Sequence, residues 1–381
     1  MKSLKFLAIF CLSALAFVGC SNSNDDNNGG NKKSLLIVAD KSIVYDNGTD
    51  KATFTLYYDG MILKEGYEIY VGDTLLEGNT FSSTEQGAYE IWAAYGTILS
   101  NEITINVVQT PPPAPAAPED TNPSKTNFRR RIFLTQITGT GCQYCPLMVN
   151  AVHLAMEGAY GDDAVLAVAH TYNDNDPAYP TDAQTIDNSL GVGGGAPALF
   201  MDLNKAYSTN YTQDAIEKNI QKRLDEVEVR GGIAVNTKYY AEEGYIVLNA
   251  TVKAKTTTEF RIGAWLLEDG IKATQSNPNS YTPVDGVDFN VHYDCVRMAD
   301  SKYTVNNYTG YSIGEIEAGK TASREFAFKL KTHGEKGSAT KWNHNNLKVI
   351  VFISTKEGGN WYVNNVISAP KDGSVDFEYV D

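Results

Sequence analysis

The central part of the fold is decided by residues 141–146, Gly-Cys-Gln-Tyr-Cys-Pro, in which two cysteines stand three positions apart. The apolar residues 132–137, Ile-Phe-Leu-Thr-Gln-Ile, predict a β-strand before them, and the residues after Cys145 predict a helix. Residues i and i+3 at a helix start lie one turn apart, within the Cα separation that a disulfide requires. Unpaired N–H groups at a helix start stabilise a thiolate there. We therefore expect a Cys142–Cys145 disulfide whose first cysteine is exposed and whose second faces the interior.

Residues 127–229 around this motif are predicted to form one α/β domain. The continuous apolar run 164–169 is typical of a strand buried on both faces, and residues 198–202 predict another strand. A helix is expected from Thr212, which is a suitable N-cap, with an apolar stripe that runs from Ile216 to Val227. A thioredoxin-like fold has the same order of elements: strand, CxxC, helix, strand, loop, proline, strand and helix.

Pro197 is the second candidate feature of the site. It follows a glycine-rich approach at 193–195 and precedes the strand at 198–202. A cis X–Pro bond costs only about 0.5–1 kcal/mol. In the cis form, Pro197 would lie beside the disulfide, and backbone groups of Ala196 would bind an extended substrate. A trans proline in an edge strand is the alternative interpretation.

The first 34 residues predict export and a lipid anchor. Lys2 and Lys5 precede thirteen mostly apolar residues, too few for a membrane-spanning helix, so residues 1–19 are interpreted as a signal peptide. The ending at Cys20 resembles a bacterial lipoprotein box, in which the cysteine is acylated after cleavage. An ordinary signal peptide with a coincidental cysteine is the alternative. Residues 20–34, rich in Asn and Asp, predict a flexible tether.

Two further segments predict β-sandwiches, which makes this a multidomain fold. Residues 35–108 contain short alternating strands separated by turn signals and resemble a bacterial immunoglobulin-like module. Residues 109–126 hold six prolines and predict an extended, semi-rigid linker. Residues 230–381 return to strand patterns and predict a larger antiparallel β-sandwich after the thioredoxin-like domain.

Charge and composition exclude several classes of function. The net charge of −14 argues against nucleic-acid binding, which needs clustered Lys and Arg. The compact basic cluster Arg129–Arg131 is interpreted as a solvated strand start. Zinc would need two ligands beyond the CxxC, yet the five histidines are scattered, so no metal or cofactor is expected. The acidic run 173–176 lacks the pattern of a calcium loop and is interpreted as a solvated loop. Cys295 is interpreted as a small buried apolar residue.

The whole pattern resembles the outer-membrane-protein-28-related lipoprotein family of Bacteroidetes. The resemblance rests on residues 138–146, on the Gly-Ala-Pro that ends at Pro197, and on the β-rich segment after the last helix. It covers roughly residues 128–381 and implies a thioredoxin-like domain in a lipid-anchored outer-membrane protein exposed at the cell surface. It implies no particular reaction, because the family is named for its location.

Two functions are consistent with these features. In the first, Cys142 and Cys145 catalyse thiol–disulfide exchange with protein or peptide thiols or disulfides, with Cys142 as the attacking thiolate and Cys145 as the resolving thiol. In the second, the chain is a noncatalytic binding or scaffold lipoprotein, and its disulfide only fixes the helix start. The membrane, through the lipid anchor, is a partner in both.

Overall fold

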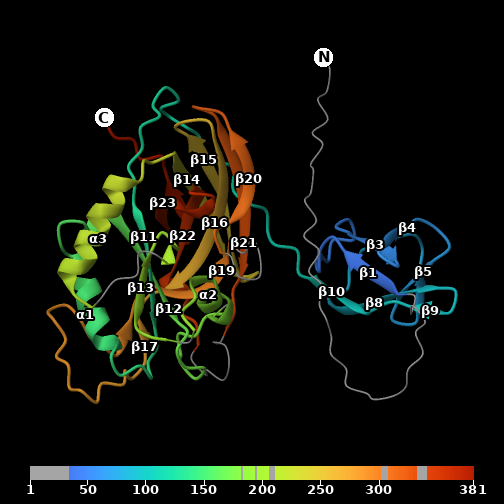
Figure 1. Cartoon of the computed structure of the whole chain (residues 1–381), viewed down its shortest axis with the longest axis horizontal. Helices are drawn as coiled ribbons and strands as arrows, with labels where there is room; N and C mark the ends of the chain where they lie inside the picture. Colours follow the sequence, from blue (N-terminus) through green and yellow to red (C-terminus); the bar gives the residue numbers. More distant parts are fainter. Residues whose placement is uncertain (1–33, 182, 194, 206–210, 302–307, 333–340) are drawn as a thin grey trace. The chain divides into compact units, whose positions relative to one another are not determined.

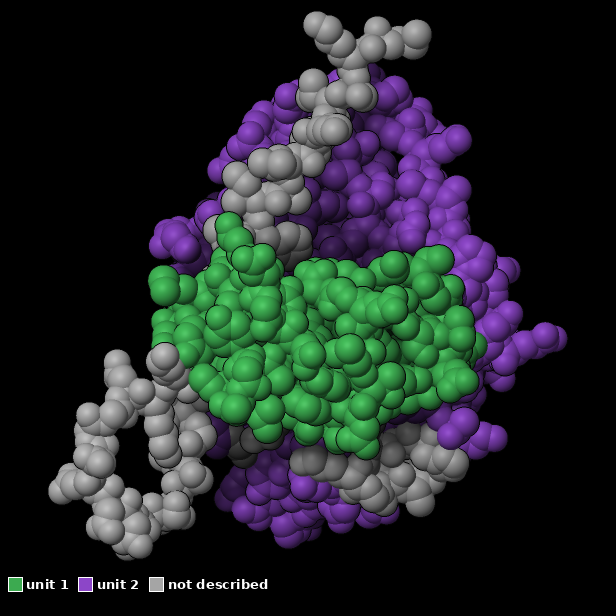
Figure 2. Space-filling view, turned by 90° about the vertical axis from the view of Figure 1, so that its right-hand side faces the viewer, with its two compact units in different colours: residues 1–110 green, residues 111–381 purple. Residues whose placement is uncertain are grey.

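The computed structural model describes residues 34–181, 183–193, 195–205, 211–301, 308–332 and 341–381. The chain forms two compact units, one ending at Thr110 and the other beginning at Pro111 (Figure 2). The predicted signal peptide and Cys20 lie outside the described residues, as does Gly194 of the glycine-rich approach. Among the residues that are described, no helix combines the length and apolar character needed to cross a membrane.

The first unit consists of two β-sheets around one apolar core. The first sheet contains β1 (Leu35–Ala39), β3 (Ala52–Tyr58), β4 (Met61–Leu63) and β7 (Thr80–Phe81). The second contains β2 (Ile43–Tyr45), β5 (Glu68–Val71), β6 (Thr74–Leu76), β8 (Gly87–Tyr95), β9 (Ile98–Leu99) and β10 (Ile103–Val108). Alternate residues of β3 (Ala52, Phe54 and Leu56) are buried in this core, as the strand period of two requires.

The second unit begins with an α/β segment. Its elements are β11 (Ile132–Thr138), α1 (Cys145–Met156), the short 3₁₀ helix η1 (Gly161–Asp163), β12 (Ala164–His170), α2 (Ala183–Leu190), β13 (Ala198–Met201) and α3 (Gln213–Glu226). Strand β11 lies between β12, which is parallel to it, and β13, which is antiparallel. Thr212 caps α3 by accepting a hydrogen bond from the Ala215 N–H. Helix α2 falls in a stretch for which the sequence predicts no element.

The rest of the second unit is β-rich. Its strands are β14 (Gly231–Tyr240), β15 (Tyr245–Ala254), β16 (Thr258–Glu268), β17 (Ile271–Lys272), β18 (Val291–His292), β19 (Cys295–Asp300), β20 (Tyr311–Ile316), β21 (Thr321–Lys329), β22 (Leu347–Glu357), β23 (Asn360–Pro370) and β24 (Gly373–Val375), with a 3₁₀ helix η3 (His344–Asn346). Strands β21, β15, β14 and β24 form a four-stranded sheet, of which β21, β15 and β14 are labelled in Figure 1. Strand β17 pairs with β18.

One large sheet connects the α/β segment to the later strands. Its order is β13-β11-β12-β19-β16-β22-β23, with β20 also paired to β16. The connection is the parallel pairing of β12 with β19, at Val168 and Cys295. Strands on both sides of the boundary expected at residues 229–230 therefore lie in the same sheet.

Side chains on the two faces of this sheet enter different cores. Ile132 and Leu134 of β11 pack with α1 and α3 on one face. Phe133 and Ile137 point to the other face, where they join Trp265, Phe352 and the apolar residues of α2. At its far end, the sheet packs on the four-stranded sheet through a third core, which includes Phe260, Ile262, Val351, Leu248 and Phe328.

A buried ionic network joins the start of β11 to later strands. Asp202, which is fully buried, accepts hydrogen bonds from Arg130 at 2.8 Å and from Arg223 at 2.6 Å. Arg223 also forms an ion pair with Glu357 on β22. The interpretation of the arginine triplet as solvated is therefore wrong for Arg130, which is only 8% exposed, because a carboxylate far along the chain neutralises it.

Part of the proline-rich segment lies along strands β14 and β15. The side chains of Tyr240 and Asn249 donate hydrogen bonds to the carbonyl oxygens of Pro113 and Pro115, respectively. Lys253 forms a 2.6 Å ion pair with Asp120. These contacts place residues 113–120 within the second unit.

Candidate functional site

The CxxC motif occupies the loop between β11 and α1. Its two cysteines form a disulfide with Cα atoms 5.4 Å apart. Backbone hydrogen bonds from the Cys142 N–H to Gly139 O and from the Cys145 N–H to Cys142 O fold the loop into consecutive turns. Pro146 stands in the first turn of α1, where a missing N–H removes no helical hydrogen bond. The local chain thus positions both sulfur atoms at the start of α1.

Both cysteines are buried, which differs from the sequence-based expectation for Cys142. Cys142 is 2% exposed and Cys145 is fully buried. A segment more than 130 residues later covers the motif, since the Gln275 side-chain amide donates hydrogen bonds to Cys142 O at 2.9 Å, Gly139 O at 3.2 Å and Thr140 O at 3.3 Å. The Ser276 N–H adds a hydrogen bond to Thr140 O at 2.7 Å. Solvent therefore has little access to the disulfide in this conformation.

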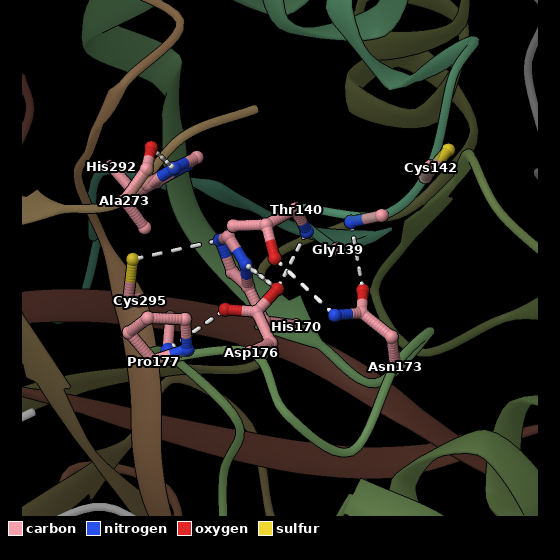
Figure 3. Close-up of polar contacts among 12 residues, drawn as sticks. Gly139, Thr140, Cys142, His170, Asn173, Asp176, Pro177, Ala273, His292 and Cys295 are labelled. Atoms are coloured by element: carbon pink, nitrogen blue, oxygen red, sulfur yellow. Dashed lines mark hydrogen bonds and ion pairs between the residues drawn. The ribbon is translucent and has the colours of Figure 1, made fainter. Parts of the chain in front are cut away.

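The polar insert after β12 holds the other side of the loop (Figure 3). Asp176 Oδ2 accepts hydrogen bonds from the Thr140 N–H at 2.6 Å and interacts with His170 Nδ1 at 2.9 Å. Asn173 Oδ1 accepts a hydrogen bond from the Gly141 N–H at 2.9 Å. The interpretation of residues 173–176 as a solvated loop is wrong for Asp176, which is fully buried, because these donors replace its hydration.

Electrostatics and close packing both explain why these residue types occur here. Burial alone would raise the pKa of Asp176, but the charge and hydrogen bond of His170, together with backbone N–H groups, hold this pKa well below its usual value. Gly139 is required by space, because a Cβ there would lie 2.7 Å from both Asn173 Oδ1 and Tyr172 Cβ. The loop is thus fixed by a buried carboxylate and by a close approach of the insert.

His170 also connects this network to strands β18 and β19. Its Nε2 lies 3.7 Å from Cys295 Sγ, and its ring lies 4.8 Å from the His292 ring, nearly perpendicular to it. Burial, and then repulsion from His170, lowers the pKa of His292 to about 4. Burial raises the pKa of the Cys295 thiol well above its ordinary value, so this thiol is protonated at neutral pH. In the described part of the chain, no group of three or more His, Cys, Asp or Glu side chains is arranged to hold a metal ion.

Pro197 lies at the same end of the sheet as the CxxC loop. The Ala196–Pro197 peptide bond is cis. Strand β13 begins one residue later, and Ala198 pairs with Ile137, next to the last residue of β11. Since β11 runs directly into the CxxC loop, this register brings Ala196 and Pro197 beside the start of that loop. Ala196 is half-buried and Pro197 is buried.

Sequence reasoning missed the residues that hold the loop from outside it: Gln275, Asn173, Asp176 and His170. A sequence signal existed only for the insert, whose Asn-Asp-Asn-Asp run follows a buried strand. Nothing near Gln275 in the sequence distinguishes it from a surface glutamine.

Comparisons with known proteins give a family match over part of the chain and a similar fold. The family model for the outer membrane protein Omp28 matches residues 184–372 and points to an outer-membrane location. The structure of HBP35 of Porphyromonas gingivalis is similar with a TM-score of 0.50 and 18% identity, over 68% of this chain and 81% of that one. The alignment with the adhesin InvE of Yersinia pseudotuberculosis spans 90% of this chain and 61% of InvE at 9% identity. Its TM-score of 0.17 is too low to support an argument. No curated protein matches the chain.

These findings define a β-rich protein with a disulfide at the start of a helix, which over residues 184–372 is similar to the Omp28 outer membrane protein family. The family similarity expected over residues 128–381 is thus confirmed in part, because the Omp28 match spans residues 184–372 and does not include the CxxC motif, while HBP35 shows a similar fold.

Proposed function

We propose that this protein is a lipid-anchored outer-membrane protein, exposed at the cell surface, whose thioredoxin-like segment exchanges disulfides through Cys142 and Cys145. The match to the Omp28 model supports the location. The lipid anchor rests on Cys20 and the leader before it. Exchange activity is proposed from the site geometry.

Three features lie at one end of the sheet, and this arrangement is the observation that supports the proposed exchange activity. The disulfide lies at the start of α1, the cis Pro197 lies beside the CxxC loop, and the half-buried Ala196 precedes that proline. A sulfur next to a helix start is stabilised as a thiolate by unpaired N–H groups and by the helix dipole. In this proposal, backbone groups of Ala196 bind an extended substrate at the same end of the sheet.

In the exchange reaction, the Cys142–Cys145 disulfide is reduced to two thiols while two substrate thiols are oxidised to a disulfide. A substrate thiolate attacks Cys142 Sγ, the Cys142–Cys145 bond breaks, and Cys145 leaves as a thiolate that takes up a proton. The second substrate thiol, once deprotonated, attacks the mixed disulfide and releases Cys142, so the substrate gains the disulfide. In the reverse direction, the Cys142 thiolate attacks a substrate disulfide and Cys145 resolves the intermediate.

Burial of the disulfide adds one requirement to this proposal. With Cys142 only 2% exposed, an attacking sulfur reaches it only after neighbouring residues move, and the proposal assigns this movement to residues 275–276, which are hydrogen-bonded to the backbone of the loop. The same burial favours the second candidate function, a noncatalytic scaffold whose disulfide fixes the helix start, since a structural disulfide is shielded from attack.

Trapping of the mixed disulfide separates the two functions. A Cys145→Ser variant is mixed with a peptide that contains one activated disulfide, and its mass is measured. Exchange predicts a covalent adduct at Cys142 in this variant and none in the matched Cys142→Ser variant, because Cys142 is the attacking thiol and Cys145 only the resolving one in the proposed reaction. Absence of an adduct in both variants would support the scaffold function.

A further inference from the structure

A cavity of about 410 Å³ lies between α1, the sheet and the loop that connects β17 to β18. It is separate from the CxxC loop, and we call it the α1 cavity. Its floor comes from the α1-facing side of β11 and β12, where Gln136 pairs with Val168 and Thr138 with His170. Val149, Val152 and Met156 line it from the helix. This volume is within the range of small-molecule sites.

The cavity exists because a loop rather than a helix covers this part of the sheet. Asn150 of α1 holds the loop with two hydrogen bonds, from its Nδ2 to Thr282 O at 2.9 Å and from the Val284 N–H to its Oδ1 at 3.1 Å. Gly286 approaches α1 so closely that a Cβ there would lie 3.1 Å from His153 Nε2. The loop therefore encloses the space without filling it.

One buried side chain in the lining of the cavity has a polar atom without a partner. Gln136 is 2% exposed, and its Nε2 has no hydrogen-bond partner among the residues that the structure describes. Buried amides are almost always hydrogen-bonded, and an unpaired one costs free energy. An acceptor from a bound molecule would satisfy this donor.

The charges around the cavity restrict the kind of acceptor. Four carboxylates line it, those of Glu157, Asp269, Asp288 and Asp294. The lysine that lines it, Lys348, already forms ion pairs with Asp269 at 2.7 Å and Asp294 at 2.6 Å. Three histidines, His153, His170 and His292, also line it, but His170 is paired with the buried Asp176. The four carboxylates outnumber the cationic groups that could attract an anionic ligand, so a neutral acceptor is favoured.

We propose that the α1 cavity binds a small neutral molecule with an apolar body and a carbonyl group, which accepts a hydrogen bond from Gln136 Nε2. The apolar body packs against the valine, leucine and methionine side chains of α1 and β12, and against Phe289 of the loop. The proposal does not rest on the exchange activity, because neither cysteine of the disulfide lines the cavity; the connection to the CxxC loop is indirect, through His170 and Asp176.

Three naphthalene derivatives of similar size test the proposal on the purified full-length protein. 2-Acetylnaphthalene has the carbonyl, 2-isopropenylnaphthalene replaces the carbonyl oxygen by a CH₂ group, and 2-naphthoate carries a negative charge. Equilibrium dialysis is expected to give saturable binding of the ketone with one site per chain. We expect the alkene to bind about 2- to 13-fold more weakly, as one net hydrogen bond predicts, and the naphthoate more weakly still. Failure of the ketone to saturate, or equally tight binding of the naphthoate, would overturn the proposal.

Two variants locate the site. Gln136→Leu has nearly the same volume and removes an unpaired buried donor, so it is expected to keep the melting temperature while the preference for ketone over alkene disappears. Val287→Trp fills the cavity from the loop and is expected to abolish binding, whereas Val284→Trp in the same loop lies outside the lining and serves as its control. A preference that persists in Gln136→Leu would refute the role of Gln136. If a variant does not fold, the ligand series on the unmodified protein still decides the proposal.

Discussion

Replacing Gln275 by alanine is expected to speed reduction of the Cys142–Cys145 disulfide. The Gln275 amide has two N–H protons, and it donates to Cys142 O, Gly139 O and Thr140 O across distances of 2.9–3.3 Å. Two net hydrogen bonds of about 0.5–1.5 kcal/mol each give about 1–3 kcal/mol in favour of the closed arrangement. If attack requires residues 275–276 to move away, their loss raises the population of the open form, and hence the reduction rate, by about 5- to 150-fold.

The assay is the rate of thiol appearance under excess dithiothreitol, followed by alkylation and mass measurement. Asn277→Ala is the matched control, because Asn277 bonds within its own loop, to Tyr281, and to no residue of the CxxC motif. We expect the control to be reduced at the rate of the unmodified protein. A Gln275→Ala rate equal to that of the control would refute the conclusion that this glutamine restricts access to Cys142.

Three other predictions concern stability and anchoring. Asp202→Asn removes the ion-pair partner of the buried Arg130 and leaves the buried Arg223 paired with Glu357. It is expected to lower the free energy of unfolding, measured by urea denaturation, by about 3–5 kcal/mol, against about 0–1 kcal/mol for the exposed Asp214→Asn, and equal effects would contradict the role of the network. Between pH 6.5 and about 4 the unfolded chain protonates His292 while the folded protein keeps it neutral, so the free energy of unfolding falls by about 3 kcal/mol as the pH is lowered through this range. His292→Gln is therefore expected to flatten the dependence of stability on pH in this range, and an unchanged slope would contradict this role. Intact mass of protein extracted from membranes is expected to show acyl chains at Cys20, and a mature N-terminus elsewhere would exclude the anchor.

Local patterns were sufficient to locate the elements that carry the CxxC motif. The strand expected at residues 132–137 is β11, the helix after Cys145 is α1, and the stripe from Ile216 lies on α3. Each follows from a periodicity within a few turns or residues of chain. Helix α2 was missed because its eight residues, Ala-Gln-Thr-Ile-Asp-Asn-Ser-Leu, contain few large apolar side chains.

Features that depend on distant contacts could not be predicted. The continuous sheet requires β12 to pair with β19, more than 120 residues later, and no local pattern specifies that pairing. The cover over Cys142 comes from Gln275 in the same way. Asp176 was misread because its neighbours are polar, although the chain folds them around the Thr140 N–H and His170. Burial of a polar residue is decided by its partners, which composition does not reveal.

A redox titration of the Cys142–Cys145 pair tests the central proposal most directly. The protein is equilibrated in thiol–disulfide buffers of defined potential, free thiols are alkylated, and they are counted by mass spectrometry. An exchange function predicts a midpoint potential above about −270 mV, with Cys295 reduced throughout because it is fully buried. A midpoint below about −300 mV would contradict exchange and identify a structural disulfide in a surface scaffold.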